Sequence, residues 1–441
     1  MPETNKTIAA IDLGTNKTIA IAATKDEQGK IIIRGIGEAD TQGVIRGSVQ
    51  NIGLASASIK EAVEKCQKVA HVNFKNVFVG ISGQSISGEI NSHSKIIDNF
   101  ITDDDIAQLT RELLQMSSGQ GENIVQIIPQ NYTVDNVSVG INPKGCIGRK
   151  LEGTFFIVKG KDKAVKNLKT AVEMAGLTVI KLILEPMASA EAVLSKDEKE
   201  IGVLVADIGA GTADIAVYQD NILRYVAVVP LGGKAITNDI KKGCAVIERQ
   251  AEQIKTQFGA ALSQKDFAKK VISIKGVNGK TKEIPFNKIA TIINARTEEI
   301  LGGIAYELDA IKSQNISLAG GIVITGGTAK LKNILQLAKF CLGIEARKGI
   351  PLNVPPEYAY ENYSAAVGLI YRGMEYYEEL MERKRKEAEK QTQAATEQNT
   401  DKNKEPKGKE SKGKDNSQGG ISGFFRRLTD KIFSDPDDSK M

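Results

Sequence analysis

IAAIDLGTNKTIAIAAT, residues 8–24, predicts a strand that ends in Asp-x-Gly, then a tight turn and a second strand. IGVLVADIGAGTADIAVYQDN, residues 201–221, repeats that arrangement, with Asp207 at the position that Asp12 holds in the first segment. One Asp-x-Gly turn carries little information, because such turns are common in proteins. Its recurrence at the same point of the same strand–turn–strand unit indicates a duplicated domain whose two halves share a cleft.

The pattern around these two hairpins predicts an α/β fold. Further strands are expected over residues 30–39, 77–82, 179–186 and 322–327. Helical spacing of apolar residues is found over residues 51–69, 165–175, 187–195, 244–258, 287–303 and 331–340. Strands that alternate with helices are typical of α/β architecture.

Composition excludes several classes of function. A chain of 441 residues suggests about three domains. The 59 Lys and Arg residues against 54 Asp and Glu leave a net charge of +5, too small to favour nucleic-acid binding, and Trp is absent. The N-terminus lacks a signal-peptide pattern, and no apolar run is long enough to span a membrane.

The cysteine and histidine content argues against several kinds of site. No CxxC pair occurs and only two histidines are present, so neither a disulfide framework, a zinc site nor a Ser-His-Asp triad is expected. The scattered cysteines are expected to be reduced thiols: Cys66, Cys146, Cys244 and Cys341.

Small residues at both hairpin tips predict a phosphate-binding site. Without a bulky Cβ, backbone N–H groups can approach phosphate oxygens closely. Gly326 and Gly327 follow an apolar strand and precede a helix, which suits close approach to the nucleoside end of a nucleotide. The residues expected at the two tips are Gly14, Thr15 and Asn16, and Gly209, Ala210, Gly211 and Thr212.

Charged residues beside the tips complete the predicted nucleotide site. Asp12 and Asp207 cannot face a triphosphate without a cation between them, so they are expected to hold Mg²⁺, through water. Lys17 would add positive charge near the phosphates. Taken alone, each hairpin is equally compatible with an ordinary tight turn. The absence of GxxxxGK[ST], of the kinase HRD and DFG motifs and of a GxGxxG after the first strand excludes P-loop, kinase and Rossmann sites.

Several strings together resemble known families. The two hairpins, EPMASAEAVL (185–194) and IVITGG (322–327) resemble the phosphate 1, connect 1, phosphate 2 and adenosine elements of the actin/Hsp70/sugar-kinase superfamily. Over residues 6–372 the chain further resembles FtsA, a family of actin-like bacterial division proteins. The strings that carry this second resemblance are SGQSISG (82–88), IIPQNYTVD (127–135), PLGGKAITNDI (230–240), AEQIKTQFG (251–259), GGIVITGGTAKLKNI (320–334) and YSAAVGLI (363–370).

The resemblance implies a two-lobed actin-like ATPase fold with duplicated mixed-sheet subdomains. Residues 382–419 contain no Leu, Ile, Val, Phe, Tyr or Trp and can bury nothing, which predicts disorder there. The expected division is subdomain 1A at 1–82 and 166–200, FtsA-type subdomain 1C at 83–165, subdomain 2A at 201–240 and 304–378, subdomain 2B at 241–303, a disordered linker at 379–419 and a membrane-targeting amphipathic helix at 420–435.

The resemblance also implies roles for individual residues. Glu252 and Lys255 match residues near the ribose and base, although by themselves they are an ordinary i,i+3 surface pair. Gly233 and Gly327 match backbone contacts to the nucleotide. Glu185 matches a catalytic position that orients water, with ATP hydrolysis at most slow.

Subdomain 2B is implied to bind the tail peptide of the ring protein FtsZ. Asn294, Arg296 and Glu299 lie on the matching helix. Arg296 would pair with an acidic peptide, while a solvated helix face explains each of these residues equally well.

The C-terminal segment ISGFFRRLTDKIF, residues 421–433, has helical amphipathic spacing. Following a linker, it has no nearby core, so it would dock on a partner groove or lie in a membrane interface. Aromatic residues with flanking cations favour an anionic membrane, and FtsA proteins carry such a membrane-targeting helix. The apolar stripe is Ile421, Phe424, Phe425, Leu428 and Ile432, with Phe433 at its edge and Arg426, Arg427 and Lys431 as flanking cations.

FtsA-like function would be that of an ATP- and Mg²⁺-binding cytoskeletal protein. It would self-associate into filaments, tether the FtsZ ring to the inner face of the cytoplasmic membrane at the division septum, and recruit other division proteins through subdomain 1C. Nucleic acid is not expected as a partner. The alternatives are a phosphotransferase of the same superfamily, an Hsp70-like chaperone ATPase and a pilus-assembly actin-like protein.

Overall fold

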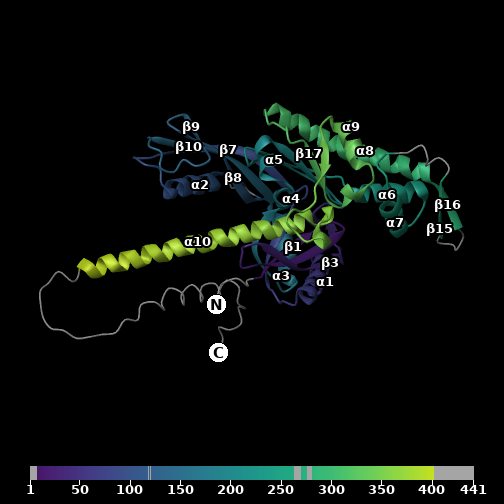
Figure 1. Cartoon of the computed structure of the whole chain (residues 1–441), viewed down its shortest axis with the longest axis horizontal. Helices are drawn as coiled ribbons and strands as arrows, with labels where there is room; N and C mark the ends of the chain where they lie inside the picture. Colours follow the sequence, from purple (N-terminus) through teal and green to yellow (C-terminus); the bar gives the residue numbers. More distant parts are fainter. Residues whose placement is uncertain (1–6, 118, 120, 263–269, 276–280, 402–441) are drawn as a thin grey trace.

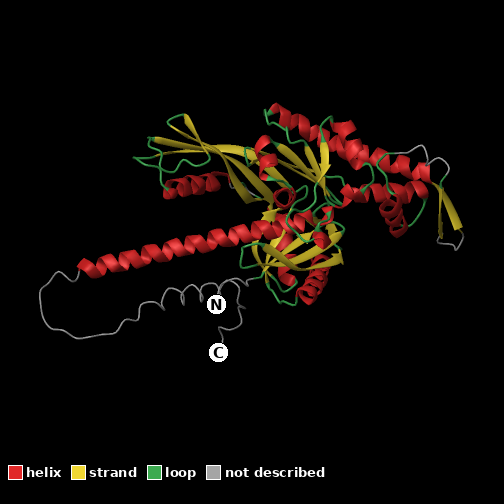
Figure 2. Ribbon diagram, viewed as in Figure 1, coloured by secondary structure: helices red, strands yellow, loops and turns green. Residues whose placement is uncertain are grey.

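The computed structural model describes residues 7–401 except 118, 120, 263–269 and 276–280 (Figure 1). Two β-sheets, each covered by helices, form the main body, and a smaller subdomain extends from each end of it (Figure 2). This is the α/β, two-lobed architecture that the sequence predicts.

The two main sheets have the same strand order. The sheet of lobe 1 runs β11–β6–β1–β2–β3, and that of lobe 2 runs β18–β17–β12–β13–β14. In lobe 1 the strands are β1 (Ile8–Leu13), β2 (Lys17–Lys25), β3 (Ile31–Asp40), β6 (Asn76–Ile81) and β11 (Thr178–Leu184). In lobe 2 they are β12 (Val203–Ile208), β13 (Ala213–Gln219), β14 (Ile222–Val229), β17 (Ile322–Thr325) and β18 (Ala346–Lys348).

The two hairpins also share one register, which confirms the predicted duplication. Asp12 pairs with Ile19 across β1 and β2, and Asp207 pairs with Asp214 across β12 and β13. Each turn closes with an equivalent backbone hydrogen bond. The N–H of Gly14 donates to the Lys17 carbonyl at 3.1 Å, and the N–H of Gly209 donates to the Thr212 carbonyl at 2.9 Å.

Apolar strand faces explain why the lobes lie against each other. On β1, Ile8 and Ala10 face the layer between the two sheets, while the alternate residues face the helices outside. Val203 and Val205 of β12 face the same middle layer from the other side. Both strands are therefore buried on two faces, as their nearly continuous apolar sequences require.

Helices fill the middle layer and cover the outer faces. Helices α4 (Glu185–Val193) and α10 (Ser364–Asp401) pack between the sheets. The outer face of lobe 1 is covered by α1 (Ile52–Ala70) and α3 (Asp162–Met174), and that of lobe 2 by α6 (Gly233–Cys244), α8 (Phe286–Ser313) and α9 (Ile334–Leu342). Shorter elements are α5 (Lys196–Ile201), β4 (Val44–Ile45), β5 (Ser48–Val49) and the 3-10 helices η2 (Gly327–Lys330), η3 (Pro356–Tyr358) and η4 (Glu361–Tyr363).

Each lobe carries one insertion at a different point of the repeat. The insertion in lobe 1 is subdomain 1C, which lies between β6 and α3 and has its own sheet and core. It contains β7 (Ile86–Ile96), α2 (Asp103–Ser117), β8 (Glu122–Val134), β9 (Val137–Gly140) and β10 (Lys150–Lys161). The insertion in lobe 2 follows β14 and includes α7 (Glu248–Phe258), β15 (Val271–Lys275) and β16 (Thr281–Pro285).

The C-terminal helix differs from the prediction. A disordered linker from residue 379 is wrong for residues 379–401, which continue helix α10 (Figure 1). A segment without large apolar side chains cannot join a core, but it can still form a helix, because helix hydrogen bonds are local. Glu, Lys, Arg, Ala and Gln, which make up most of this segment, are strong helix formers. The i,i+4 ion pair of Glu382 with Lys386 adds local support.

The rest of the predicted tail lies outside the described residues. This applies to residues 402–419 of the linker and to the amphipathic helix at 420–435. Within the part of the chain that the structure does describe, no helix combines the length and the apolar character needed to cross a bilayer.

Helices α4 and α10 cross so closely that only glycine fits at one position. A Cβ on Gly368 would lie 1.7 Å from the carbonyl oxygen of Ala188, so we expect Gly368→Ala to push the helices apart and destabilise the fold by about 1–3 kcal/mol or more. The measurement is the midpoint of urea unfolding. Gly302→Ala in α8 is the matched control, because its Cβ would meet no atom within 4 Å and alanine favours helix. Equal midpoints for the two variants would contradict the packing argument.

Candidate nucleotide site

A cleft of ≈ 640 Å³ lies between the two lobes. Both hairpin tips, the turn after β17 and helix α7 contribute to its walls. Every residue predicted for the nucleotide, the cation or catalysis lines it, namely Asp12, Gly14, Thr15, Asn16, Lys17, Glu185, Asp207, Gly209, Ala210, Gly211, Thr212, Gly233, Glu252, Lys255, Gly326 and Gly327.

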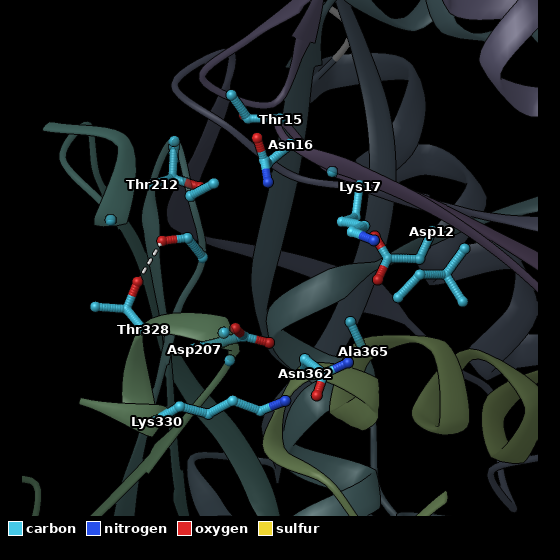
Figure 3. Close-up of a pocket in the computed structure, with 18 of the residues that line it drawn as sticks. Asp12, Thr15, Asn16, Lys17, Asp207, Thr212, Thr328, Lys330, Asn362 and Ala365 are labelled. Atoms are coloured by element: carbon cyan, nitrogen blue, oxygen red, sulfur yellow. Dashed lines mark hydrogen bonds between the residues drawn. The ribbon is translucent and has the colours of Figure 1, made fainter. Parts of the chain in front are cut away.

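The two hairpin tips face each other across the cleft. A Cβ on Gly211 would lie 2.2 Å from Oγ1 of Thr15, so the tips can approach this closely only because Gly211 has no side chain. The backbone N–H of Gly47 donates to that same Thr15 Oγ1 at 3.1 Å. Figure 3 shows Thr15 and Asn16 on one side and Thr212 on the other.

The carbonyl of Gly209 organises the wall formed by lobe 2. It accepts hydrogen bonds from the backbone N–H of Gly233 and from Oγ1 of Thr328, both at 2.9 Å (Figure 3). These bonds hold the hairpin tip, the start of α6 and the turn after β17 together. The three segments form one wall although they are far apart in the chain.

The two glycines of the β17 turn play different parts. Gly326 has φ +85°, and a Cβ there would lie 2.2 Å from Oδ1 of Asp207, so glycine is needed for the fold of the turn. A Cβ on Gly327 would meet no atom within 4 Å. Gly327 therefore leaves open space at the cleft, which a ligand can use.

Glu252 and Lys255 are not a solvated surface pair. The Lys255 ammonium lies 2.9 Å from the Glu252 carboxylate and donates to the Gly233 carbonyl at 3.1 Å and to Oγ1 of Thr237 at 2.9 Å. Only 13% of the Lys255 side chain is exposed. The pair joins α7 to α6 at the edge of the cleft, and part of Glu252 remains accessible there.

Four carboxylates line the space between the lobes, three of them placed there by strand alternation and one by the start of a helix. Asp12 follows Ile8 and Ala10 on one face of β1, and Asp207 follows Val203 and Val205 on β12. Glu185 opens α4, and its carboxylate lies against Gly80, where a Cβ would meet Oε1 at 2.4 Å. The fourth carboxylate is Asp214, which pairs with Asp207 across the hairpin.

Burial raises the pKa of all four groups, and repulsion by neighbouring carboxylates adds to it for Asp12, Glu185 and Asp214. Burial, followed by the charges of Glu185, Asp207 and Asp214, raises the pKa of Asp12 well above its ordinary value. Burial raises the pKa of Glu185 to about 7 and that of Asp207 to about 6, against the opposing effect of hydrogen bonds from Ser82 and Ser189. Burial and neighbouring carboxylates also raise the pKa of Asp214.

This donor set fits a cation held through water. Oδ1 of Asp214 is buried and has no hydrogen-bond partner. Within the described ranges no three Asp, Glu, His or Cys side chains stand close enough to ligate one ion directly. Mg²⁺ keeps several of its waters in proteins, so Asp12, Asp207 and Asp214 can hold it without direct convergence.

The ammonium of Lys17 is already paired within lobe 1. It donates to Glu38 at 3.1 Å and lies 3.9 Å from Asp40, and half of the side chain is exposed. Glu38 also accepts from the hydroxyl of Tyr363 at 2.5 Å, which joins lobe 1 to the segment before α10. Lys17 lines the cleft, but its charge is already paired with lobe 1 carboxylates.

Sequence reasoning missed several residues of the cleft. Lys330 reaches from η2 towards Asn362 in Figure 3, and its ammonium lies 5.4 Å from the centre of the Tyr360 ring. Oδ1 of Asn362 is buried without a hydrogen-bond partner. The quoted motifs give none of these residues a role in the site. The sequence does offer a signal for Asp214. It lies two residues after the tip residue Thr212, and it pairs with Asp207 across the hairpin.

The three residues predicted for FtsZ binding lie on α8, away from the cleft lining. Nδ2 of Asn294 donates to the Ala261 carbonyl at 2.8 Å. Nε of Arg296 donates to Asp239 at 2.6 Å, and its Nη1 pairs with Glu299. At 100° per residue, Asn294 and Arg296 are about 160° apart around the helix, so the three do not share one face.

Three models of known protein families match parts of this chain. A family model described as cell division protein FtsA matches residues 204–368, one described as the SHS2 domain inserted in FtsA matches residues 80–159, and one described as Hsp70 protein matches residues 161–222. The SHS2 match covers most of subdomain 1C.

Similar proteins from individual bacteria also belong to the FtsA family. The chain is 32% identical to cell division protein FtsA of Neisseria meningitidis over 377 residues, which cover 84% of this chain and 91% of that protein. It is 31% identical to FtsA of Pseudomonas aeruginosa, with 85% and 90% covered. A solved structure of a PilM–PilN type IV pilus biogenesis complex has a TM-score of 0.62 at 16% identity, covers 83% of this chain and 98% of that chain, and shows likeness of fold.

Glu185→Gln should change the pH dependence of stability. The raised pKa means that the folded chain keeps a proton between pH 4.5 and about 7 that the unfolded chain releases, so the wild-type free energy of unfolding falls as pH rises through this window. Gln removes that loss, and the nucleotide-free variant should be more stable than wild type at pH 8, by up to roughly 3 kcal/mol, but not at pH 4.5. Urea unfolding at both pH values measures the difference, with Glu64→Gln on the exposed face of α1 as control. A stability difference independent of pH would contradict the prediction.

Proposed function

This chain belongs to the FtsA family of cell division proteins, and from that premise we propose that it binds ATP with Mg²⁺ between its two lobes. The observation that carries the proposal is the pair of facing hairpin tips at one cleft, with Asp12 and Asp207 behind them. Backbone N–H groups of small-residue turns suit phosphates, and the carboxylates suit a hydrated cation.

Different segments of the chain would bind different parts of the nucleotide. The tips at Gly14 and Gly209 would hold the phosphates, and the open side of Gly327 would accept the nucleoside. Glu252 and Lys255, which are fixed to α6, would contact the ribose and base. Mg²⁺ would neutralise phosphate charge, and Asp12, Asp207 and Asp214 would hold its waters.

Glu185 would act on water rather than on the nucleotide. Its carboxylate lies between Gly80 and the other carboxylates and accepts a hydrogen bond from Ser82. A pKa near 7 lets such a group accept a proton at neutral pH. We expect hydrolysis to be at most slow, as the resemblance to FtsA proteins implies.

The proposed cellular role is to tether the FtsZ ring to the inner face of the cytoplasmic membrane at the septum. The FtsZ tail peptide would bind at subdomain 2B near Asn294, Arg296 and Glu299. Because Arg296 already pairs with Asp239 and Glu299, an acidic peptide would have to share or displace these partners. Subdomain 1C would serve self-association into filaments and contacts with other division proteins.

Membrane attachment would come from the segment 421–433. One helix with five apolar residues binds an anionic bilayer weakly. A filament presents many such helices together, so avidity would hold the assembly on lipid while single chains exchange. In this proposal nucleotide-dependent self-association controls residence on the membrane.

Gly327→Val tests the nucleotide site. Its side chain would enter open space, so the protein should fold normally, while affinity for ATP falls at least tenfold because the valine occupies the nucleoside position. Equilibrium binding of a fluorescent ATP analogue with Mg²⁺ gives the affinity. Asp12→Asn should weaken binding only when Mg²⁺ is present, and Gly302→Ala should bind as wild type. Wild-type affinity in Gly327→Val would refute the proposed position of the nucleoside.

Deletion of residues 420–441 tests the tether. The truncated chain should bind ATP as before but no longer sediment with liposomes that contain anionic lipid, and it should fail to bring purified FtsZ to them. Phe424→Asp in the full chain should have the same effect, because it places a charge in the apolar stripe. Sedimentation that persists after deletion would show that another surface binds the lipid.

A further inference from the structure

Subdomain 1C contacts both lobes, although it is an insertion in only one of them. The chain enters it after β6 and leaves it before α3, both in lobe 1. Strand β14, the edge strand of the lobe 2 sheet, packs against β7 and β8 of the subdomain. The subdomain is therefore bonded covalently to one lobe and non-covalently to the other.

The contact with lobe 2 has an apolar part. Phe156 and Val158 on β10 belong to the same buried cluster as Leu223 and Val226 on β14, and all four are less than 9% exposed. Apolar burial holds the two surfaces together but tolerates small sliding movements, because it has no direction.

A polar contact beside this cluster fixes the register. The amide of Gln130 on β8 is buried, and its Nε2 donates to the Leu223 carbonyl at 2.9 Å. Nη1 of Arg224 donates to both the backbone O and the side-chain Oε1 of Gln130 at 3.2 Å, and its Nη2 donates to Asp220 at 3.0 Å. Sliding β14 along β8 would leave a buried amide unpaired, which is costly.

One hairpin joins this contact to the cleft. Strand β13 begins beside Thr212, carries Asp214 and ends at the turn of Asp220 and Asn221, both of which have positive φ. Seven residues of strand span roughly 23 Å. The cleft and the Gln130–Arg224 contact thus lie at opposite ends of the β13–β14 hairpin.

The attachment to lobe 1 also begins at the cleft. Ser82 lines the cleft and hydrogen-bonds Glu185, and β7 starts four residues later. Gly83 between them has φ +90°. The backbone N–H of Lys161, at the end of β10, donates to the Ser85 carbonyl at 3.1 Å, which ties the exit of the subdomain to its entrance.

We propose that Gln130 and Arg224 are positioning residues that couple occupancy of the nucleotide cleft to the orientation of subdomain 1C. A nucleotide that draws the two hairpin tips together moves the β13–β14 hairpin relative to lobe 1, and the fixed register transmits that movement to the subdomain. The inference rests on the proposed ATP site and adds its regulation: the 1C surface offered to partners depends on the nucleotide. By linkage, a partner that holds the subdomain in one orientation changes ATP affinity by the same factor.

The test measures a distance in the full chain. Cys146 and Cys341 are replaced by serine, and spin labels are placed at Val137→Cys on subdomain 1C and at Gln336→Cys on lobe 2, both exposed positions. Pulsed electron paramagnetic resonance gives the distance distribution without nucleotide and with saturating Mg-ATP, and calorimetry gives the ATP affinity of every variant. The test variants are Gln130→Leu and Arg224→Met, which keep side-chain volume. Lys144→Ala, which breaks an exposed ion pair with Asp103 inside the subdomain, is the matched control.

We expect Mg-ATP to shift the distance distribution in wild type and in Lys144→Ala. In Gln130→Leu and Arg224→Met the nucleotide-dependent shift should be lost while ATP affinity stays within about threefold of wild type, and thermal unfolding confirms that each variant is folded. The inference is overturned if wild type binds ATP without a distance change, or if either variant keeps the full shift. Failure of wild type to bind ATP would instead refute the proposed function, on which the inference rests.

Discussion

Concentrated negative charge is the constraint that the cleft has to satisfy. Asp12, Glu185, Asp207 and Asp214 face one space between the lobes. Burial opposes the ionisation of all four, and repulsion opposes it further for Asp12, Glu185 and Asp214. Lobes this close are stable only when protons or a cation offset that charge. The nucleotide-free chain does so by holding protons, which becomes harder as pH rises. A hydrated divalent cation would do so at neutral pH, and a phosphate chain would then be attracted to it.

The same strands build the core and the cleft. The first residues of β1 and β12, such as Ile8 and Val203, fill the apolar layer between the sheets, and their last residues on that face are Asp12 and Asp207. The close crossing of α4 and α10 at Gly368 holds this layer together. A change in lobe packing must therefore change the distance between the carboxylates. Conversely, a change of charge in the cleft must affect the packing of the apolar layer. Phe156 of subdomain 1C is part of that core, so the position of the subdomain depends on the same packing.

The sequence predicts the parts of this arrangement that repeat or alternate. Both hairpins, their identical register and the convergence of the predicted residues on one cleft follow from a duplicated pattern with a period of two along each strand. Contacts that depend on the third dimension were not predictable in this way. Lys17 pairs with Glu38, and Glu252 with Lys255 is fixed to α6, because of neighbours that no local pattern indicates. The lack of apolar residues from 382 onward predicts a linker, whereas the polar continuation of α10 needs only local hydrogen bonds and ion pairs and no burial.

The length of α10 affects how the proposed tether would work. Its first turns are fixed in the core through Val367, Ile370 and Met374, and 38 residues of helix extend about 57 Å at 1.5 Å per residue. The helix projects away from the main body (Figure 1), so its far end has a direction set by the lobes. A flexible chain of the same length would let each membrane segment search a wide volume. A helix narrows that volume, so neighbouring chains in a filament would present their membrane segments at similar positions. Avidity depends on such simultaneous engagement, so in the proposed tether the stiffness of α10 would matter in addition to the affinity of the membrane segment.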